Sequence, residues 1–318
     1  MRMRCAVLDD YQNITATTDW SAIRDQVEVL SFQEHFAGME TLVQSVGDCE
    51  IIVAMRERTP FPASLFAQLP RLKLLVTTGM RNAAIDLNAA ARHQVVVSGT
   101  TGSSYATSEQ TWALILGLTK HLVQENQALR THGPWQSTVS IDLQGKTLGL
   151  LGLGRIGSQV AIVGKAFGMR VMAWSQNLTQ ERTQVLGVEK APSKEHLLRE
   201  SDIVSIHLVL SQRTQGLIGA HELALMRPSA FLINTSRAAI VDQTALKAAL
   251  ARHTIAGAGL DVFDVEPLSA DDEFRSLSNV LATPHLGYVS QDTYHAWFPQ
   301  IVEDIAAFLA GHPIRVLS

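Results

Sequence analysis

The chain has 318 residues, of which 46% are hydrophobic and 18% are charged, so it is long enough for two globular domains with well-packed cores. Its formal net charge of −4 leaves no basic excess, which argues against nucleic acid and anionic membranes as partners. The two cysteines, Cys5 and Cys49, lie outside any C-x-x-C pair, so we expect no bound metal and no disulfide scaffold.

The N-terminus, MRMRCAVLDDY, enters a predicted strand directly and lacks the long apolar segment of a signal peptide. Further along the chain, no uninterrupted apolar run reaches the length needed to span a membrane. We therefore expect a cytoplasmic protein.

Through the first hundred residues, short β-branched runs alternate with helix-like stretches. The predicted strands are CAVLDDY, VEVLSF, EIIVAM, LKLLVTT and VVVSGT, and the helices between them include PASLFAQLP and IDLNAAARH. This order predicts a parallel sheet covered on both faces. The next stretch, residues 108–130, is amphipathic over its whole length and predicts one long helix, ended by Gly133-Pro134.

A second βα series follows, with predicted strands at TLGLLGL, RVMAWS, IVSIHLV, AFLINTS, GAGLDVF and VLATPH. Residues 290–309 are helical in pattern, and HPIRVLS closes the chain. The pattern predicts two α/β domains joined by long helices. The last helix could fold back onto the first domain.

The segment GLGRIG lies between a predicted strand and a predicted helix, and another strand follows. In a dinucleotide site, Gly152 permits the tight turn, Gly154 lets backbone approach a pyrophosphate, and Gly157 lets helix and strand pack closely. The helix N-terminus adds N–H groups for the phosphates. An ordinary glycine-rich turn is the alternative, but the strand–helix–strand context favours a dinucleotide held by the whole turn, Arg155 and Ile156 included.

The strand after this turn ends in a way that leaves NAD and NADP both open. An NAD-selective site usually has Asp or Glu there, bound to the ribose 2′-OH. Here Ser175 holds that position and Asn177 follows, so we assign both to the adenosine ribose. No arginine adjoins them to bind a 2′-phosphate, since Arg182 comes several residues later.

Polar residues also follow three later strands. They are Arg237 in FLINTSRAAIVDQTAL, Asp261 and Glu266 in GAGLDVFDVEPL, and His285 in VLATPHLGY. Ligands of open α/β sheets bind beyond the carboxyl ends of the strands, so these side chains could meet beside a nicotinamide. Each also has a purely structural interpretation, as a strand-capping arginine, a loop carboxylate or a turn histidine.

The motifs GLGRIG, NTSRAAIVDQTAL, AGLDVFDVEP and TPHLGY, in this order and spacing, resemble the D-isomer-specific 2-hydroxyacid dehydrogenase family, which includes phosphoglycerate dehydrogenase and glyoxylate/hydroxypyruvate reductase. The resemblance covers nearly the whole chain. It implies an α/β fold of two Rossmann-like, doubly wound parallel-sheet domains. A dinucleotide-binding domain at 105–289 would be inserted into a discontinuous, flavodoxin-like substrate domain at 1–104 and 290–318.

The resemblance assigns catalysis to Arg237, Glu266 and His285. His285 would donate a proton to the carbonyl oxygen of a 2-keto acid as hydride arrives, and would accept it back in the reverse direction. Histidine suits this task because an ordinary imidazole titrates near neutrality. Glu266 would fix the imidazole tautomer, and the planar guanidinium of Arg237 would clamp the substrate carboxylate.

Further cofactor residues follow from the same resemblance. Asp261 would bind the nicotinamide carboxamide, and Thr235 would lie near the nicotinamide. His207, Val209 and Thr214 would line the adenosine side, although the family often has proline where Val209 stands.

In this family a loop of the first domain binds the substrate carboxylate through backbone N–H groups. The matching loop here contains Thr78, Gly79, Met80 and Arg81. Arg81, and similarly Arg56, could bind a second anionic group of the substrate or simply face solvent.

The helix at 108–130 and the loop THGPWQS resemble the arm through which family members dimerise, so we expect a homodimer.

The leading hypothesis is an NAD- or NADP-dependent oxidoreductase acting on a small D-2-hydroxy acid or its 2-keto partner. An NAD-sensing corepressor of the same fold is the alternative, since such corepressors keep the same three catalytic residues. An S-adenosylmethionine-dependent methyltransferase would leave His285 without a role. The specific hydroxy acid and the physiological direction stay open.

Overall fold

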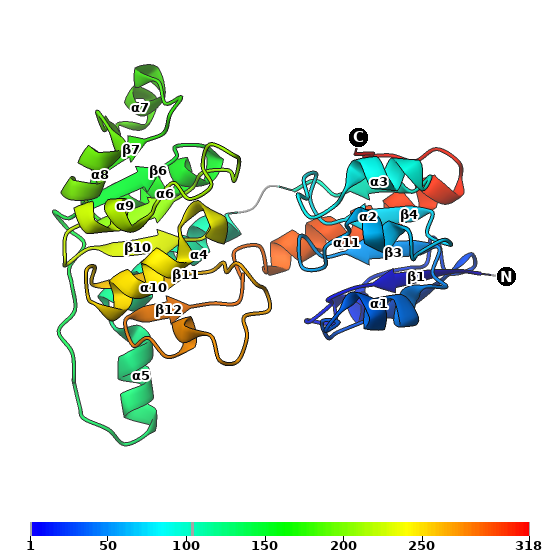
Figure 1. The fold of residues 1–318 in the computed structure, drawn as a ribbon, viewed down its shortest axis with the longest axis horizontal. Coiled ribbons are helices and arrows are strands. Elements are labelled where there is room, and N and C mark those ends of the chain that lie inside the picture. The colour runs from blue at the N-terminus through cyan, green and yellow to red at the C-terminus, as the bar shows by residue number, and fades with distance from the viewer. Residues whose placement is uncertain (1, 103–104, 318) are drawn as a thin grey trace. The chain divides into compact units, whose positions relative to one another are not determined.

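The computed structural model describes residues 2–102 and 105–317, and it divides into two compact units. The first unit is formed by residues 1–104 and 290–318, and the second by the continuous stretch 105–289. The chain thus leaves the first unit, builds the second and returns (Figure 1). Across the described residues, no helix combines the length and apolar character needed to cross a membrane.

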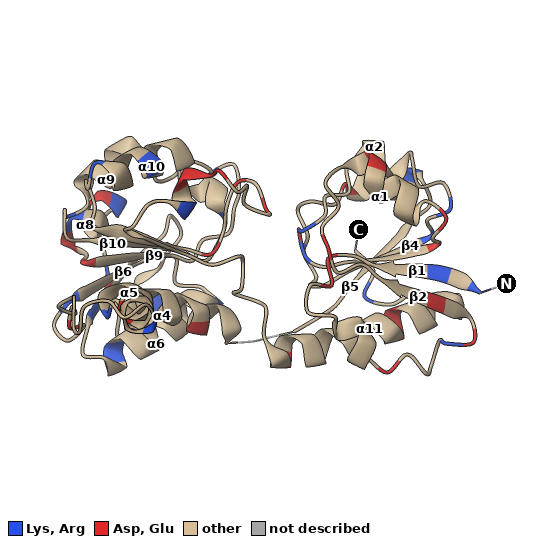
Figure 2. Ribbon diagram, turned by 90° about the horizontal axis from the view of Figure 1, so that it is seen from below, with Lys and Arg blue, Asp and Glu red and all other residues tan. Residues whose placement is uncertain are grey.

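The first unit contains a five-stranded parallel sheet in the order β2-β1-β3-β4-β5. Its strands are β1 (Met3–Val7), β2 (Val27–Ser31), β3 (Ile51–Ala54), β4 (Leu74–Thr77) and β5 (Val96–Gly99), and its helices are a 3₁₀ turn (Ile14–Thr17), α1 (Met39–Val46), α2 (Ala63–Phe66), α3 (Leu87–Arg92) and α11 (Gln291–Leu309). Figure 2 shows α1 and α2 on one face and α11 on the other. Every residue of β3 and β4 is buried, as expected for strands covered on both faces.

The second unit contains a seven-stranded parallel sheet in the order β12-β11-β10-β9-β6-β7-β8. Its strands are β6 (Thr147–Leu151), β7 (Arg170–Trp174), β8 (Glu189–Lys190), β9 (Ile203–Ile206), β10 (Phe231–Asn234), β11 (Gly257–Leu260) and β12 (Val280–Ala282). Its helices are α4 (Ala106–Thr119), α5 (Leu122–Arg130), α6 (Arg155–Ala166), α7 (Gln180–Leu186), α8 (Lys194–Glu200), α9 (Ala220–Leu225) and α10 (Gln243–Ala251), with 3₁₀ turns at Ala238–Ile240 and Glu273–Arg275. Helices cover both faces of this sheet as well (Figure 2). The predicted α/β class with two parallel sheets is therefore confirmed.

The single long helix predicted over residues 108–130 is wrong, because the structure has two helices there. Residues of α4 pack into the core, whereas every residue of α5 is exposed or half-buried. The α4 hydrogen-bond ladder stops where the Ile141 N–H donates to the Thr119 carbonyl, at 2.8 Å. His121 then adopts a left-handed backbone, with φ of 52°, and the second helix starts.

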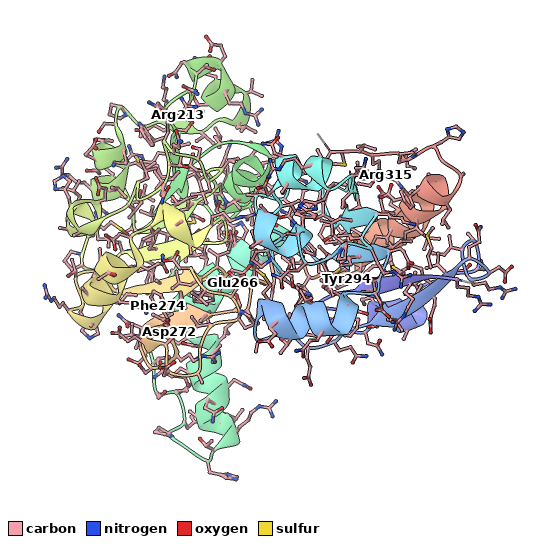
Figure 3. The ribbon with its side chains drawn as sticks, turned by 45° about the vertical axis from the view of Figure 1, so that its right-hand side comes forward. Arg213, Glu266, Asp272, Phe274, Tyr294 and Arg315 are labelled. Carbon is pink, nitrogen blue, oxygen red and sulfur yellow. The ribbon has the colours of Figure 1, made fainter. Side chains whose placement is uncertain are left out.

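The end of the chain completes the first unit. Helix α11 packs on β4 and β5, and Tyr294 on it donates a hydrogen bond to Gln12 in the loop after β1, at 2.8 Å. Beyond α11, the Leu317 N–H donates to the Val97 carbonyl of β5 at 2.8 Å. Arg315, labelled with Tyr294 in Figure 3, forms an ion pair with the buried carboxylate of Asp304 on α11, at 2.9 Å.

Candidate active site

The glycine turn joins β6 to α6. Gly152 has φ of +104°, a conformation that favours glycine, and a Cβ built there would lie 2.7 Å from the His207 carbonyl oxygen. A Cβ at Gly157 would lie 2.2 Å from the Gly152 carbonyl oxygen, so this glycine allows α6 to pack against the turn. A Cβ at Gly154 would meet nothing within 4 Å, which leaves open space for an approaching group.

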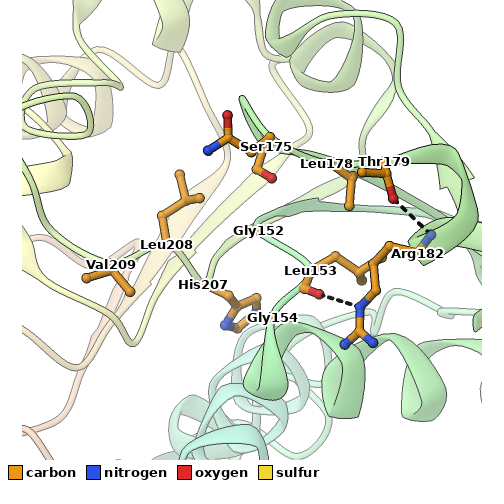
Figure 4. Close-up of a pocket in the computed structure, with 11 residues that line it drawn as sticks. Gly152, Leu153, Gly154, Ser175, Leu178, Thr179, Arg182, His207, Leu208 and Val209 are labelled. Atoms are coloured by element: carbon orange, nitrogen blue, oxygen red, sulfur yellow. Dashed lines mark hydrogen bonds between the residues drawn. The ribbon is translucent and has the colours of Figure 1, made fainter.

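A pocket of about 350 Å³ lies beside this turn (Figure 4). Its walls come from the turn itself, from the segment after β7 and from the segment after β9. These three strands are neighbours in the sheet, so their carboxyl ends meet at one edge. The lining residues are Gly152, Leu153, Gly154, Ser175, Asn177, Leu178, Thr179, Arg182, His207, Leu208 and Val209.

The pocket fits the phosphates and the adenosine of a dinucleotide. The first turn of α6, Arg155-Ile-Gly-Ser, carries no carboxylate that would compete for the N–H groups at the helix start. Six of the predicted cofactor residues line the pocket: Gly152, Gly154, Ser175, Asn177, His207 and Val209. Residues 155–157 lie just beyond it, at the start of α6.

Of the predicted residues that follow β9, His207 lines the pocket and Thr214 does not. Burial lowers the pKa of His207 to about 4, so its ring is neutral near pH 7, and its Nε2 lies 2.9 Å from the Ser205 hydroxyl. The Thr214 hydroxyl donates to the Val209 carbonyl at 2.7 Å and accepts from the Ser211 N–H at 2.8 Å. Thr214 therefore holds the turn that follows the pocket.

Arg182 lines the pocket, although its separation from Ser175 along the chain argues against a place there. The sequence feature that indicates this position is Thr179, the N-cap residue of α7. Its hydroxyl accepts a hydrogen bond from the Arg182 N–H at 3.3 Å. One helical turn brings residue 182 back toward the glycine turn.

A second group of predicted residues lies after β10, β11 and β12, which are also neighbours in this sheet. His285 Nδ1 lies 2.7 Å from Glu266 Oε2, and the side chains are 19% and 28% exposed. The other Glu266 oxygen accepts from the Phe263 N–H at 2.8 Å, which fixes the carboxylate. His285 has φ of 53°, so its loop must be held firmly by the surrounding structure.

Asp261 supplies that support. It is fully buried, and its Oδ1 accepts from the Thr283 hydroxyl at 2.6 Å and from the Leu286 N–H at 2.7 Å. Its Oδ2 accepts from the Gly287 N–H at 2.8 Å. Burial raises the pKa of Asp261, and these hydrogen bonds act against that rise. The carboxylate thus ties down both sides of His285.

Arg237 and Thr235 follow β10. Arg237 is half-buried and its Nη1 donates to the Ser236 carbonyl at 2.8 Å. Thr235 is buried, with its hydroxyl 2.8 Å from that of Thr111 on α4. The sheet therefore brings Arg237, Glu266 and His285 to the same edge as the pocket.

In the first unit, the predicted substrate loop follows β4 and packs against Arg56. The Arg56 N–H donates to the Thr78 hydroxyl at 2.9 Å, and its Nη1 donates to the Thr78 carbonyl at 3.2 Å. Two of the backbone N–H groups that the resemblance assigns to the substrate carboxylate have hydrogen-bond partners within the first unit. The Thr78 N–H donates to the Ala54 carbonyl, and the Gly79 N–H donates to the Thr100 hydroxyl. Met80 and Arg81 are exposed.

We expect Gly79→Ala to lower the free energy of unfolding by about 1–3 kcal/mol through backbone strain, and by more than Gly311→Ala does, because a clash with Arg56 adds to the strain at Gly79. Gly79 has φ of +96°, and a Cβ there would lie 2.0 Å from Arg56 Nη1. Urea denaturation measures the loss. Gly311→Ala is the matched control, because Gly311 has φ of +80° but open space around it. Equal losses for the two variants would show that the contact with Arg56 is unimportant.

Comparison with known proteins shows the family of the chain. Residues 112–287 match the family model described as D-isomer specific 2-hydroxyacid dehydrogenase, NAD binding domain. The chain is 41% identical over 256 residues to glyoxylate reductase of Aeropyrum pernix, covering 78% of this chain and 76% of that protein. It is 36% identical over 263 residues to D-3-phosphoglycerate dehydrogenase of Bacillus subtilis, covering 82% of this chain and 50% of that protein.

The fold has close counterparts among solved structures. The crystal structure of phosphoglycerate oxidoreductase from Vibrio cholerae o395 superimposes with a TM-score of 0.93 at 33% identity, covering 97% of this chain and 99% of that one. The family resemblance drawn from the four motifs is thereby confirmed. The chain belongs to the D-isomer-specific 2-hydroxyacid dehydrogenases, a family of NAD(P)-dependent oxidoreductases.

Proposed function

We propose that the protein reduces a small 2-keto acid to the D-2-hydroxy acid, and catalyses the reverse oxidation, with His285 as the general acid and base. The observation that carries this proposal is the 2.7 Å contact between His285 and Glu266, at the sheet edge that also bears the glycine-turn pocket. When bound, the nicotinamide cofactor supplies or accepts the hydride.

The roles of the chain's own residues follow from their bonds. Glu266 engages Nδ1 of His285, so Nε2 is the nitrogen that faces substrate and exchanges the proton with the carbonyl oxygen. Glu266 is itself fixed by the Phe263 N–H, which keeps the imidazole in one orientation. Arg237 orients the substrate through its carboxylate, for which a planar guanidinium offers paired donors.

The substrate is proposed to be a small 2-keto acid. The relatives are named for glyoxylate and for D-3-phosphoglycerate, so the substrates to test include both an unsubstituted and a phosphorylated acid. Arg56 packs against the predicted substrate loop, whereas Arg81 is exposed, and either could bind a distal anionic group.

The direct test is oxidation of NADH and NADPH, followed at 340 nm, with glyoxylate, hydroxypyruvate and pyruvate. Turnover of at least one acid is expected. Tight cofactor binding with no turnover of any acid would contradict the proposal and favour a cofactor-sensing protein.

We further propose that the protein is a homodimer assembled through α5 and the loop after it. This arm exposes large apolar side chains: Leu122, Val123, Leu129, Trp135 and Val139 are each more than half exposed. Several large apolar side chains left exposed along one short segment favour a role in a protein–protein interface.

The expected mass from light scattering is twice the chain's 34.7 kDa. Leu129→Glu combined with Trp135→Glu should yield a monomer, because both changes place charge in the interface. Val185→Glu, at an apolar residue of α7 that is 79% exposed, is the control and should stay dimeric. A wild-type monomer at micromolar concentration would exclude the dimer.

A further inference from the structure

The pocket beside the glycine turn has an unusual balance of charge for an NAD site. Among the described residues that line it are one guanidinium, from Arg182, and no carboxylate. His207 adds no charge near pH 7, because burial lowers its pKa to about 4. Ser175, directly after β7, occupies the place where a carboxylate would bind the ribose 2′-OH of NAD and repel a 2′-phosphate.

The Arg182 side chain is held in place before any ligand arrives. Its Nε donates to the Leu153 carbonyl of the glycine turn at 3.3 Å, and its Nη2 donates to the Ser158 hydroxyl on α6 at 2.8 Å. Figure 4 shows the guanidinium beside Leu153 and Gly154. These bonds do not require the two N–H groups of Nη1, which can therefore bind an anion. Because the side chain is already ordered, binding would cost little conformational entropy.

The neighbouring polar groups suit a phosphate as well. Ser175, Asn177 and Thr179 line the same wall, and their hydroxyl and amide groups are neutral hydrogen-bond donors. The carboxylate closest in sequence, Glu181, is outside the lining. Hydrogen bonds with its own backbone N–H and with Thr179, at the start of α7, hold its pKa below the usual value.

We propose that Arg182 binds the 2′-phosphate of NADPH and makes the enzyme prefer NADPH to NADH. This inference rests on the proposed function only in taking the pocket as the adenosine site of the cofactor. A dianionic phosphate gains a charge-assisted hydrogen bond from Arg182 and meets no opposing carboxylate among the described residues of the pocket wall. A ribose 2′-OH lacks the usual acidic partner there.

Binding of two nucleotide fragments tests the proposal without any turnover. By isothermal titration calorimetry, the wild-type protein should bind 2′,5′-ADP at least about tenfold more tightly than 5′-AMP, which corresponds to about 1.4 kcal/mol. Arg182→Gln should bring this ratio close to one. Arg252→Gln, which removes an exposed arginine at the C-terminus of α10, is the matched control and should keep the wild-type ratio. A wild-type ratio near one, or an undiminished ratio in Arg182→Gln, would overturn the proposal.

A second variant covers the case in which Arg182→Gln fails to fold. Ser175→Asp places a carboxylate at the end of β7 and should shift the preference toward 5′-AMP, with a matching shift of kcat/KM from NADPH toward NADH. An unchanged preference in Ser175→Asp would count against the assigned position of the phosphate. Fragment preference that depends on Arg182, together with no turnover of any 2-keto acid, would uphold this inference while refuting the proposed function.

Discussion

His285→Ala is expected to lower kcat for keto-acid reduction by at least about 100-fold, the usual scale of general acid–base catalysis. The imidazole is the group that the Glu266 contact holds ready to exchange a proton with the carbonyl oxygen. Alanine removes the proton donor but leaves Asp261 to hold the loop through Thr283, Leu286 and Gly287. Steady-state kinetics at saturating cofactor measure the effect.

The control for this variant is His221→Ala, at an exposed histidine on α9. It should keep wild-type kcat. Cofactor affinity, measured by nicotinamide fluorescence, should be similar in the wild-type protein and in both variants. If His285→Ala turned over at the wild-type rate, His285 would have no place in the mechanism.

Arg237→Lys is expected to reduce kcat/KM for the keto acid by about tenfold or more, mainly through KM. A lysine keeps the charge but offers a point contact in place of two parallel N–H donors, and a hydrogen bond to a charged group contributes about 1.5–3 kcal/mol. Arg237 lies just after β10, with Nη1 donating to the Ser236 carbonyl, so its guanidinium is oriented by the local backbone.

The matched comparison for this variant is Arg252→Lys, at an exposed site. It should change neither kcat nor KM. Unchanged kinetics in Arg237→Lys would mean that the substrate carboxylate is bound elsewhere, and Arg56 beside the loop after β4 would be the next residue to test.

Much of the fold could be predicted because its signals are local. Parallel strands such as β3 and β4 are buried throughout, so their sequences, IIVA and LLVT, are apolar except for the final Thr77. The glycine turn combines a positive φ at Gly152 with a tight contact at Gly157, and only glycine satisfies both demands. The two-residue strand β8 cannot be predicted from the sequence, because Glu189 and Lys190 are exposed and carry no apolar pattern.

The remaining errors come from contacts between distant residues. The break between α4 and α5 depends on Ile141, which takes the Thr119 carbonyl from 22 residues away, so the helical pattern alone could not reveal it. The separation of Arg182 from Ser175 along the chain argues against a shared pocket, but one turn of α7 returns Arg182 to it. The use of the Gly79 N–H by Thr100 likewise depends on the neighbouring strand.

The return of the chain to the first unit has a consequence for biosynthesis. The Ser98 hydroxyl donates to the Ile314 carbonyl at 2.9 Å, although 216 positions separate the two residues, and buried Ile301 and Ile305 of α11 help to cover one face of the β1–β5 sheet. Until α11 has been synthesised, that face lacks its cover. The continuous second unit can fold as it emerges, whereas the first unit stays incomplete until α11 and the segment after it, more than 180 positions past β5, have left the ribosome.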